Sequence, residues 1–271
     1  MNDRIKRYIP PVVLDNYGAL KSQFTYYKHK KYINNNRRFK NIATEKKLLL
    51  IGNGPSLNNI DLSKLDYMDK YVCNDFYVHK DFNDLNVKYY FNMDPREVWV
   101  ENIVKHVSVE RLNEINFFLP LSHYELISRL GDRLKNKNYL LQGGSDYYRY
   151  KHYLELHKPI LNVMNILQAL LLTANYMGYR DVFLAGFDFS FLAYKAKNEI
   201  EHFHGGDSRA FQPIEETGAY KRMTGSVNKI FTALEYLKIC TNMNVYNLSY
   251  EDSFLDIYDK FNVEKLYAEG I

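Results

Sequence analysis

A turn rich in glycine follows the first strongly apolar segment of the chain. Residues 48–51 are Leu-Leu-Leu-Ile, and the next five residues are Gly52, Asn53, Gly54, Pro55 and Ser56. An apolar run that ends in glycines is typical of a buried strand followed by a tight turn. Glycine lets a ligand or another backbone approach closely, and free peptide N–H groups at a helical turn attract anions. The segment therefore either binds a phosphate or only turns the chain.

Two details limit what this turn can be. Leu57 stands where a third glycine would complete a Gly-x-Gly-x-x-Gly fingerprint, and no Gly-Lys-Ser/Thr follows as in a P-loop. Ser56 has a side chain typical of a helix N-cap, so we expect it to cap a short helical turn whose N–H groups face a ligand. On these residues alone, both interpretations of the turn stay open.

Polar residues also end the other predicted strands. Asn74, Asn92, Asp94, Asp188 and Asn247 lie at or just after the end of an apolar run. Ligands of parallel sheets bind at the carboxyl ends of the strands, so we expect these side chains to face one site. An asparagine amide both donates and accepts hydrogen bonds, which suits ribose hydroxyls, base edges and phosphate oxygens. Each residue could instead be a turn former, the interpretation we favour for Asp94.

Two histidines are the candidates for acid–base chemistry. His202 and His204 lie in the loop that follows Asp188, and imidazole suits a general base at neutral pH. Residues two apart in an extended segment point to the same side, so the two rings would share a face. With Asp207 and Asp188 they could also form a metal site, or they could be incidental surface residues. We expect a catalytic base here and no metal ion.

Apolar and amphipathic segments alternate along the chain and predict the elements that position these residues. Strands are expected at residues 47–52, 70–75, 87–94, 115–121, 180–189 and 244–249, and helices at 96–107, 162–179 and 226–243. Gly178 is expected to end the second of these helices. Such alternation predicts an α/β fold, a mainly parallel sheet with helices on both faces.

The expected domain organisation follows from this pattern. Residues 1–46 are expected to form a basic N-terminal extension, and residues 47–271 a single domain. Residues 129–158 are polar and rich in tyrosine, so we expect an insertion there, and a lid loop at 190–225.

Basic residues are concentrated at the start of the chain. The 271 residues carry a net charge of +4, whereas residues 1–47, with twelve Lys or Arg and three Asp or Glu, carry +9. A basic segment with tyrosines is typical of an arm that binds anionic lipid or nucleic acid, or of a solvated helix packed on the domain. No nucleic-acid motif accompanies it, so we expect peripheral contact with an anionic membrane and no nucleic acid.

Cysteine usage and hydropathy predict the compartment. Cys73 and Cys240 form neither a disulfide framework nor a metal-binding spacing. Residues 1–13 hold no apolar signal segment, and the longest apolar run, 166–174, is too short to cross a bilayer. These features predict a cytoplasmic protein, peripheral on the inner membrane through its basic segment. A homo-oligomer is one open option.

Several motifs together resemble one family. The segments IGNGPSL, VCNDFY and VKYYFNMDP, followed by GYRDVFLAGFDF, resemble the bacterial sialyltransferases of the Campylobacter type and their domain-of-unknown-function 115 relatives. The resemblance covers residues 47–250. It implies a Rossmann-like domain with a lid, a CMP-sugar donor, and an inverting transfer without metal.

The resemblance also implies roles for the strand-end residues. Asn53, Gly54 and Ser56, with Gly52 and Pro55 in the same loop, would enclose the phosphate and ribose of CMP. Asn74 and Asn92 match asparagines that contact the nucleotide, and Asp188 matches the aspartate of a Gly-x-Asp-Phe motif.

Other positions depart from the family's pattern. Asn162 and Asn165 stand where the family has Thr-Ser-Gly, and Tyr194 is the candidate for a phosphate-binding tyrosine. Thr224-Gly225-Ser226 replaces the family's general-base histidine, which leaves His202 and His204 as candidates.

The function expected from this reasoning is transfer of an acidic sugar from a CMP-activated donor. The sugar would be sialic acid, a related nonulosonate or Kdo, and the acceptor a glycan or lipid-linked glycan in bacterial surface polysaccharide or lipooligosaccharide synthesis. No cofactor other than the donor substrate is expected. A pterin-type pyrophosphokinase using ATP and magnesium, which needs clustered carboxylates, is one alternative. A nucleotide-binding module without catalysis is another.

Overall fold

Eight parallel strands form one sheet in the computed structural model, which describes residues 11–44, 46–94, 96–143, 154–189, 201–206, 219–249 and 253–270. The strand order is β10-β9-β6-β1-β2-β3-β4-β5, and every neighbouring pair is parallel. The strands are β1 (Lys47–Ile51), β2 (Asp69–Cys73), β3 (Val87–Phe91), β4 (Asn116–Pro120), β5 (Lys137–Leu140), β6 (Asp181–Ala185), β9 (Asn244–Asn247) and β10 (Asp259–Lys260).

Strand β1 shows why the sheet is buried on both faces. Leu48 and Leu50 belong to one cluster of the core, Leu49 and Ile51 belong to the other, and all four are fully buried. Alternate residues of a strand point to opposite faces, so a strand covered on both sides is apolar throughout. The apolar run before the glycine turn is therefore a central strand.

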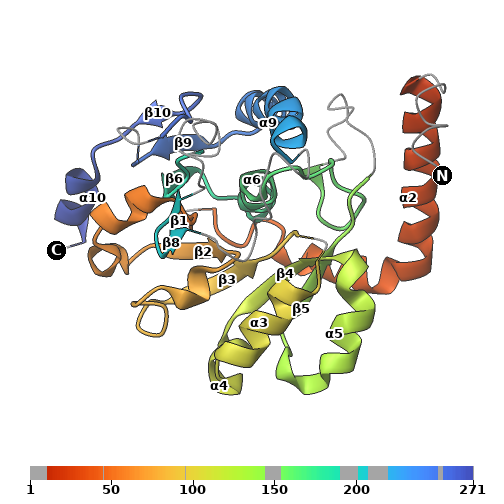
Figure 1. Ribbon diagram of the computed structural model, residues 1–271, viewed down its shortest axis with the longest axis horizontal. Helices are drawn as coiled ribbons and strands as arrows, with labels where there is room; N and C mark the ends of the chain where they lie inside the picture. The colour runs from red at the N-terminus through yellow and green to blue at the C-terminus, as the bar shows by residue number, and fades with distance from the viewer. Residues whose placement is uncertain are drawn as a thin grey trace.

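Helices cover both faces of the sheet (Figure 1). On one face, α6 (Ile166–Met177) packs against α9 (Ala219–Cys240). The other face is covered by α3 (Val98–His106), α4 (Val109–Glu114), α5 (Tyr124–Leu130) and α10 (Val263–Glu269). Short 3₁₀ helices connect these elements: η2 (Pro55–Asn59), η3 (Leu62–Leu65), η4 (Phe76–Val78), η5 (Leu121–His123) and η6 (Gly131–Arg133). This is the α/β, Rossmann-like arrangement that the sequence predicts.

Helix α6 has a defined cap at each end. The Asn165 side chain accepts a hydrogen bond from the N–H of Leu167 at 2.9 Å, and the Gln168 side chain accepts one from the N–H of Asn165 at 3.1 Å. This reciprocal pair is a capping box. At the other end Gly178 has φ 89° and donates to the carbonyl of Ala174, so the predicted helix end is confirmed.

Helix α2 (Pro11–Asn34) lies along one side of the molecule, beside the edge strand β5 (Figure 1). A kink occurs at His29, and the 3₁₀ helix η1 (Asn35–Phe39) follows. Ile33 is fully buried, and the ring of Tyr32 lies 4.8 Å from that of Tyr124 on α5. The described part of the basic segment is therefore a helix packed on the domain.

Two strands that the sequence reasoning missed lie at the two edges of the sheet. β5 falls inside residues 129–158, which were predicted to be an insertion, and β10 follows the strand predicted to be the last. Both are short, and their sequences, KNYL and DK, contain no sustained apolar run. Edge strands need less apolar sequence than central ones, which explains why the periodicity did not reveal them. In the described part of the chain, no helix combines the length and apolarity that a bilayer crossing requires.

Candidate active site at the carboxyl ends of the strands

The glycine turn after β1 lies directly against the segment after β6. Gly52 N–H donates to the carbonyl of Ala185, and Gly54 N–H to that of Gly186, each at 2.8 Å. A Cβ atom on Gly52 would lie 2.3 Å from the carbonyl oxygen of Gly186. Only glycine allows two backbones to approach this closely, so Gly52 is required by the packing of the two strand ends.

A buried carboxylate sits inside this turn. The backbone N–H of Ser56 donates to Oδ2 of Asp188 at 2.9 Å, and the Ser56 hydroxyl donates to Oδ1. A Cβ atom on Gly54 would lie 2.4 Å from the Asp188 carboxyl carbon. Asp188 is 2% exposed, so hydrogen bonds within the turn, rather than water, satisfy its carboxylate oxygens. The Asp188 side chain therefore fixes the conformation of the loop.

The helical turn after Gly54 differs from the expected one. Gly54, not Ser56, is the N-cap of η2, Pro55 occupies its first turn, and no side chain caps it. The prediction that Ser56 caps this turn is therefore wrong. The reason is that Asp188, distant in sequence, supplies the oxygen atoms that a local cap would otherwise provide.

Asn53 connects the ends of β1 and β2. When its amide is oriented so that both atoms are satisfied, Nδ2 donates to the carbonyl of Cys73 at 3.3 Å and Oδ1 accepts from the N–H of Asp75 at 3.1 Å. Its backbone carbonyl accepts from the N–H of Phe203 at 2.9 Å. Asn53 thus links three segments of the site.

A small hairpin, β7 (Glu201–His202) and β8 (Gly205–Gly206), lies over the turn. The Phe203 carbonyl accepts from the Asn58 side chain at 3.2 Å, and the Phe203 ring lies 5.0 Å from His79 and 6.2 Å from Phe76. This aromatic contact brings the loop that follows β6 back to the ends of β1 and β2. Sequence reasoning missed Phe203, although an aromatic residue between two histidines was a visible signal.

The two candidate histidines do not alternate along one extended strand. His202 belongs to β7 and pairs with Gly205, whereas Phe203 and His204 form the turn of the hairpin. The premise of a shared face, an extended segment through both histidines, is therefore wrong, because the chain reverses between the two residues. The half-buried His204 ring packs edge-on against Phe203, with centroids 4.9 Å apart. The His202 side chain lies outside the described residues.

Two non-glycine residues at the strand ends have positive φ angles. Asn74, after β2, has φ 52°, and Phe189, next to Asp188, has φ 54°. The N–H of Asn74 donates to the carbonyl of Phe91, and its carbonyl accepts from the hydroxyl of Tyr90 at 2.6 Å. Such backbone conformations are costly and persist where surrounding contacts impose them, as they often do at functional sites.

Asn92 is a buried amide with spare hydrogen-bonding capacity. It is 1% exposed, and its Oδ1 accepts from the N–H of Asp94 at 3.1 Å. Within the described part of the chain, its Nδ2 has no hydrogen-bond partner. An unpaired buried donor is costly, so a ligand acceptor at this strand end would satisfy it.

Asp94 is engaged by a neighbouring arginine. Both the N–H and the guanidinium of Arg96 donate to its carboxylate, at 2.7 to 2.9 Å. Burial acts to raise the pKa of Asp94, but these hydrogen bonds outweigh burial and hold the pKa below its usual value. Arg96 also lies 5.2 Å from the Trp99 ring. These hydrogen bonds between residues two apart in sequence agree with the favoured interpretation of Asp94 as a turn residue.

The remaining predicted residues are more dispersed. Asn165 caps α6, and both amide atoms of Asn247 bond within the protein, to Leu255 and Ser249. Asn162 is half-buried in the segment before α6. Tyr194 and Asp207 lie outside the described residues. Within the described ranges, no three His, Cys, Asp or Glu side chains are grouped closely enough to hold a metal ion.

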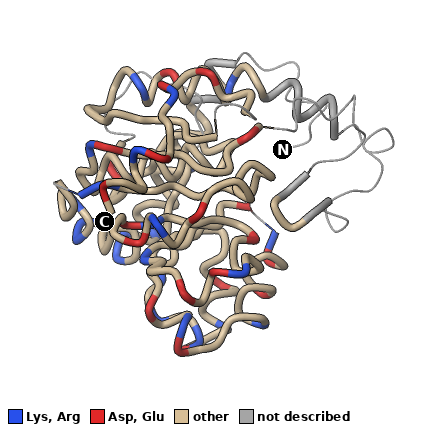
Figure 2. Tube along the Cα trace, turned by 90° about the vertical axis from the view of Figure 1, so that its left-hand side faces the viewer, with Lys and Arg blue, Asp and Glu red and all other residues tan. Residues whose placement is uncertain are grey.

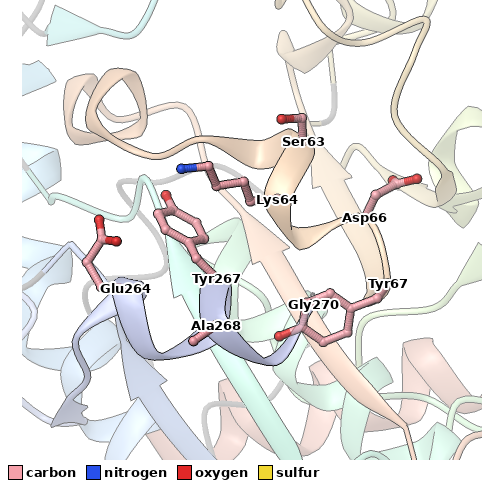
Figure 3. A pocket seen from close by; sticks show the side chains of 8 residues that line it. All are labelled: Ser63, Lys64, Asp66, Tyr67, Glu264, Tyr267, Ala268 and Gly270. Carbon is pink, nitrogen blue, oxygen red and sulfur yellow. The ribbon is translucent and has the colours of Figure 1, made fainter.

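A surface pocket of about 490 Å³ lies elsewhere, between η3 and α10 (Figure 3). Lys64, Tyr67, Glu264 and Tyr267 line it. Tyr67 precedes β2, so the pocket belongs to the amino-terminal ends of the strands, opposite the candidate site. Its mixed charges show no arrangement typical of a catalytic centre.

The fold and the position of this site define a class: an α/β, Rossmann-like protein whose candidate site lies at the carboxyl ends of parallel strands. Neither protein-family models nor curated protein sequences give a match to the chain. Solved structures do. Sialyltransferase CstII from Campylobacter jejuni, in complex with the substrate analogue CMP-3FNeuAc, is similar over 80% of this chain and 85% of its own, at 19% identity and a TM-score of 0.45.

Two further solved structures are similar. An apo α-2,3-sialyltransferase from C. jejuni matches over 82% of this chain and 86% of its own, at 20% identity and a TM-score of 0.43. The MAf glycosyltransferase from Magnetospirillum magneticum AMB-1 matches over 90% of this chain but only 40% of its own, at 10% identity and a TM-score of 0.50. Sialyltransferases of the Campylobacter type, which the motifs resemble, are thus among the structural neighbours of the chain. At these identities the likeness shows the fold.

Proposed function

We propose that this chain is a glycosyltransferase that moves an acidic sugar from a CMP-activated donor to a glycan or lipid-linked acceptor in bacterial surface polysaccharide or lipooligosaccharide synthesis. The sugar is sialic acid, a related nonulosonate or Kdo. The transfer inverts the anomeric carbon and uses no metal ion, and the enzyme works in the cytoplasm.

The observation that carries the proposal is the Asn92 amide. Its Nδ2 is buried without a partner among the described residues, at the carboxyl end of β3, where ligands of parallel sheets bind. A neutral amide donor suits a hydroxyl or carbonyl of a nucleoside and adds no charge beside the donor's phosphate. The ligand would remove the cost of leaving this group unpaired.

Two further features support a nucleotide-sugar donor. The motifs that contain Asn53, Asn74 and Asn92 occur in the order found in the sialyltransferases of the Campylobacter type. The fold is also shared with the MAf glycosyltransferase, over most of this chain. Neither feature identifies the sugar, which the experiment below addresses.

The proposed reaction assigns one role to each part of the site. A base removes the proton from the acceptor hydroxyl, whose oxygen forms a bond to the anomeric carbon as the bond to the CMP phosphate oxygen breaks. CMP leaves with the bonding electron pair. Donors of the strand-end loops other than those of Gly52, Gly54 and Ser56, which bond within the protein, would stabilise the charge that develops on the phosphate. His202 or His204, on the hairpin bonded to Asn53, is the proposed base.

A thermal-shift panel of CMP, UMP, GDP, ATP and CDP tests the proposal. A ligand that binds the native state raises the melting temperature, so CMP or CDP should stabilise the protein most. Turnover of CMP-sialic acid, CMP-Kdo and a CMP-nonulosonate, with and without EDTA, should then show metal-independent transfer. Stabilisation by ATP and magnesium alone would favour the pyrophosphokinase alternative. Binding of CMP without turnover on a broad acceptor panel would favour a non-catalytic module.

A further inference from the structure

Helix α2 carries an exposed apolar stripe. Five of its residues are large, apolar and 50 to 75% exposed: Val13, Tyr17, Leu20, Phe24 and Tyr27. They are spaced four and three residues apart in alternation, which places them on one face of a helix. A continuous row of exposed large apolar side chains marks an interaction surface rather than ordinary solvent exposure.

The stripe faces away from the protein body. A helix turns by about 100° per residue, so the stripe is centred opposite Ser22, which is buried. Among the described side chains of α2, Ile33, beyond the kink at His29, is also buried. Tyr26 and Tyr32 lie on the same inner side, and both pack against the second core cluster. The helix is therefore held by one face and presents the other outward at the side of the molecule (Figure 1).

Lysines flank this stripe. The lysines of α2 are Lys21, Lys28, Lys30 and Lys31. The first three lie beside the stripe, and Lys31 lies at its end. The sequence of the helix contains one acidic residue, Asp15. By contrast, basic and acidic residues are interspersed on the side of the molecule that carries the C-terminus (Figure 2). An apolar face bordered by lysines is typical of helices that lie in the interface of an anionic bilayer.

A basic pocket lies beside the carboxyl end of α2, where Tyr32 lines it. The pocket has a volume of about 490 Å³, and its basic side chains are Arg38, Lys135 and Lys137, while Tyr32, Tyr124 and Tyr139 form its aromatic wall. None of its lining residues is acidic. Arg38 is oriented by a 2.8 Å hydrogen bond from Nη2 to the side chain of Asn138. Three cations around a concave, partly aromatic surface suit a phosphate group.

We propose that α2 and this pocket form a membrane-docking site, in which the apolar stripe enters the headgroup boundary of an anionic bilayer and the pocket holds the phosphate of one lipid headgroup. The charge of the basic segment alone predicts attraction to such a surface. The structure adds an apolar face that can insert and a pocket that can select phosphate-bearing lipids. The inference is independent of the proposed glycosyltransferase activity.

Charge argues against a second copy of this chain as the occupant. The spacing of the stripe also suits a coiled coil, but two copies paired through it would bring the flanking lysines of both helices together. Like charges at the edges of a helix pair destabilise it, whereas an anionic bilayer neutralises them.

Vesicle flotation with the full chain tests the docking site. Vesicles of phosphatidylglycerol and phosphatidylethanolamine are compared with vesicles of phosphatidylcholine, each at low and high salt. The wild type should float with the anionic vesicles, and less at high salt. Leu20→Glu with Phe24→Glu should reduce the bound fraction by roughly ten-fold or more, because a charge replaces buried apolar area. Ile239→Glu, on α9, changes an equally exposed apolar residue and should have no effect.

The pocket is tested by Lys135→Ala with Lys137→Ala, against Lys105→Ala on α3 as the control. Loss of two basic residues near the surface should weaken anionic vesicle binding on the order of ten-fold, without changing the melting temperature. Equal flotation of the wild type and the stripe variant would overturn the proposal. A dimer in sedimentation velocity that Leu20→Glu converts to a monomer would also overturn the proposal, since the stripe would then be an interface between two copies of the chain. Equal flotation of the pocket variant and the wild type, with inorganic phosphate raising the melting temperature of the wild type alone, would reassign the pocket to a soluble phosphate.

Discussion

The backbone N–H of Ser56 lies 2.9 Å from Oδ2 of Asp188, although 132 residues separate the two in sequence. This bond, with the second from the Ser56 hydroxyl, joins the turn after β1 to the turn after β6. Because β1 and β6 are neighbours in the sheet, the pair fixes the relative position of the two loops that form the candidate site.

Asp188→Asn should destabilise the protein. The amide keeps one acceptor oxygen and loses the other, so either the Ser56 N–H or its hydroxyl is left without a buried acceptor, at a cost of about 1–3 kcal/mol. Chemical denaturation measures this change. The exposed Asp132→Asn is the matched control and should leave stability unchanged. An unaltered midpoint for Asp188→Asn would mean that the pair does not hold the loop.

Gly54→Ala should weaken both folding and nucleotide binding. The new Cβ would lie 2.4 Å from the Asp188 carboxyl carbon, so the carboxylate or the loop must shift, at a cost of roughly 1–3 kcal/mol. Lys105→Ala provides the control, because Lys105 is an exposed residue of α3 and the change adds no contact. Thermal melts with and without CMP separate the two effects. Wild-type stability and CMP affinity in Gly54→Ala would contradict the close approach.

Asn92→Asp should weaken CMP binding by about 1–3 kcal/mol, because it removes the Nδ2 donor and keeps the oxygen that accepts from Asp94 N–H. The Asn102→Asp variant on α3 is the control for an added negative charge. Isothermal titration with CMP gives the affinities. If both variants bind CMP as the wild type does, the Asn92 amide does not contact the nucleotide.

One of His202→Ala and His204→Ala should lower kcat by about 10²- to 10⁴-fold, the usual effect of losing a positioned base. CMP affinity should stay near that of the wild type, since the base acts on the acceptor. Steady-state kinetics beside CMP titrations give both quantities. Full turnover in both variants would place the base elsewhere.

Acid should destabilise the protein partly through His79. Burial lowers the pKa of His79 below its usual value, and the nearby Asp81 carboxylate only partly offsets this effect. The Nδ1 atom accepts a hydrogen bond from Asp81 N–H at 3.2 Å, which protonation would break. The unfolded state therefore binds more protons, so this contribution is complete above pH of about 6.5 and is lost as the pH falls. His79→Gln should flatten the pH dependence of the melting temperature below neutrality, whereas the exposed His106→Gln should not.

The sequence alone determined the central strands and helix α6. Residues 48–51 are apolar without interruption because both faces of β1 are buried, and such runs are visible in any sequence of a parallel sheet. The carboxyl end of α6 was visible for a similar reason, since Gly178 can adopt the left-handed conformation that stops a helix, whereas the helix begins four residues after its predicted start at residue 162. These features depend on local chemistry, so the residues themselves carry the signal.

Only the tertiary structure decided how the site is assembled. The pairing of Ser56 with Asp188, the position of Phe203 against Asn53, and the reversal of the chain at His204 depend on which strands become neighbours. Sheet order is set by contacts between distant segments, and no local pattern records it. The same holds for α2, whose apolar residues are visible in the sequence. Ser22 and Ile33 are buried, and the stripe opposite Ser22 is left outward, because a helix can bury only one of two opposite faces against a single surface.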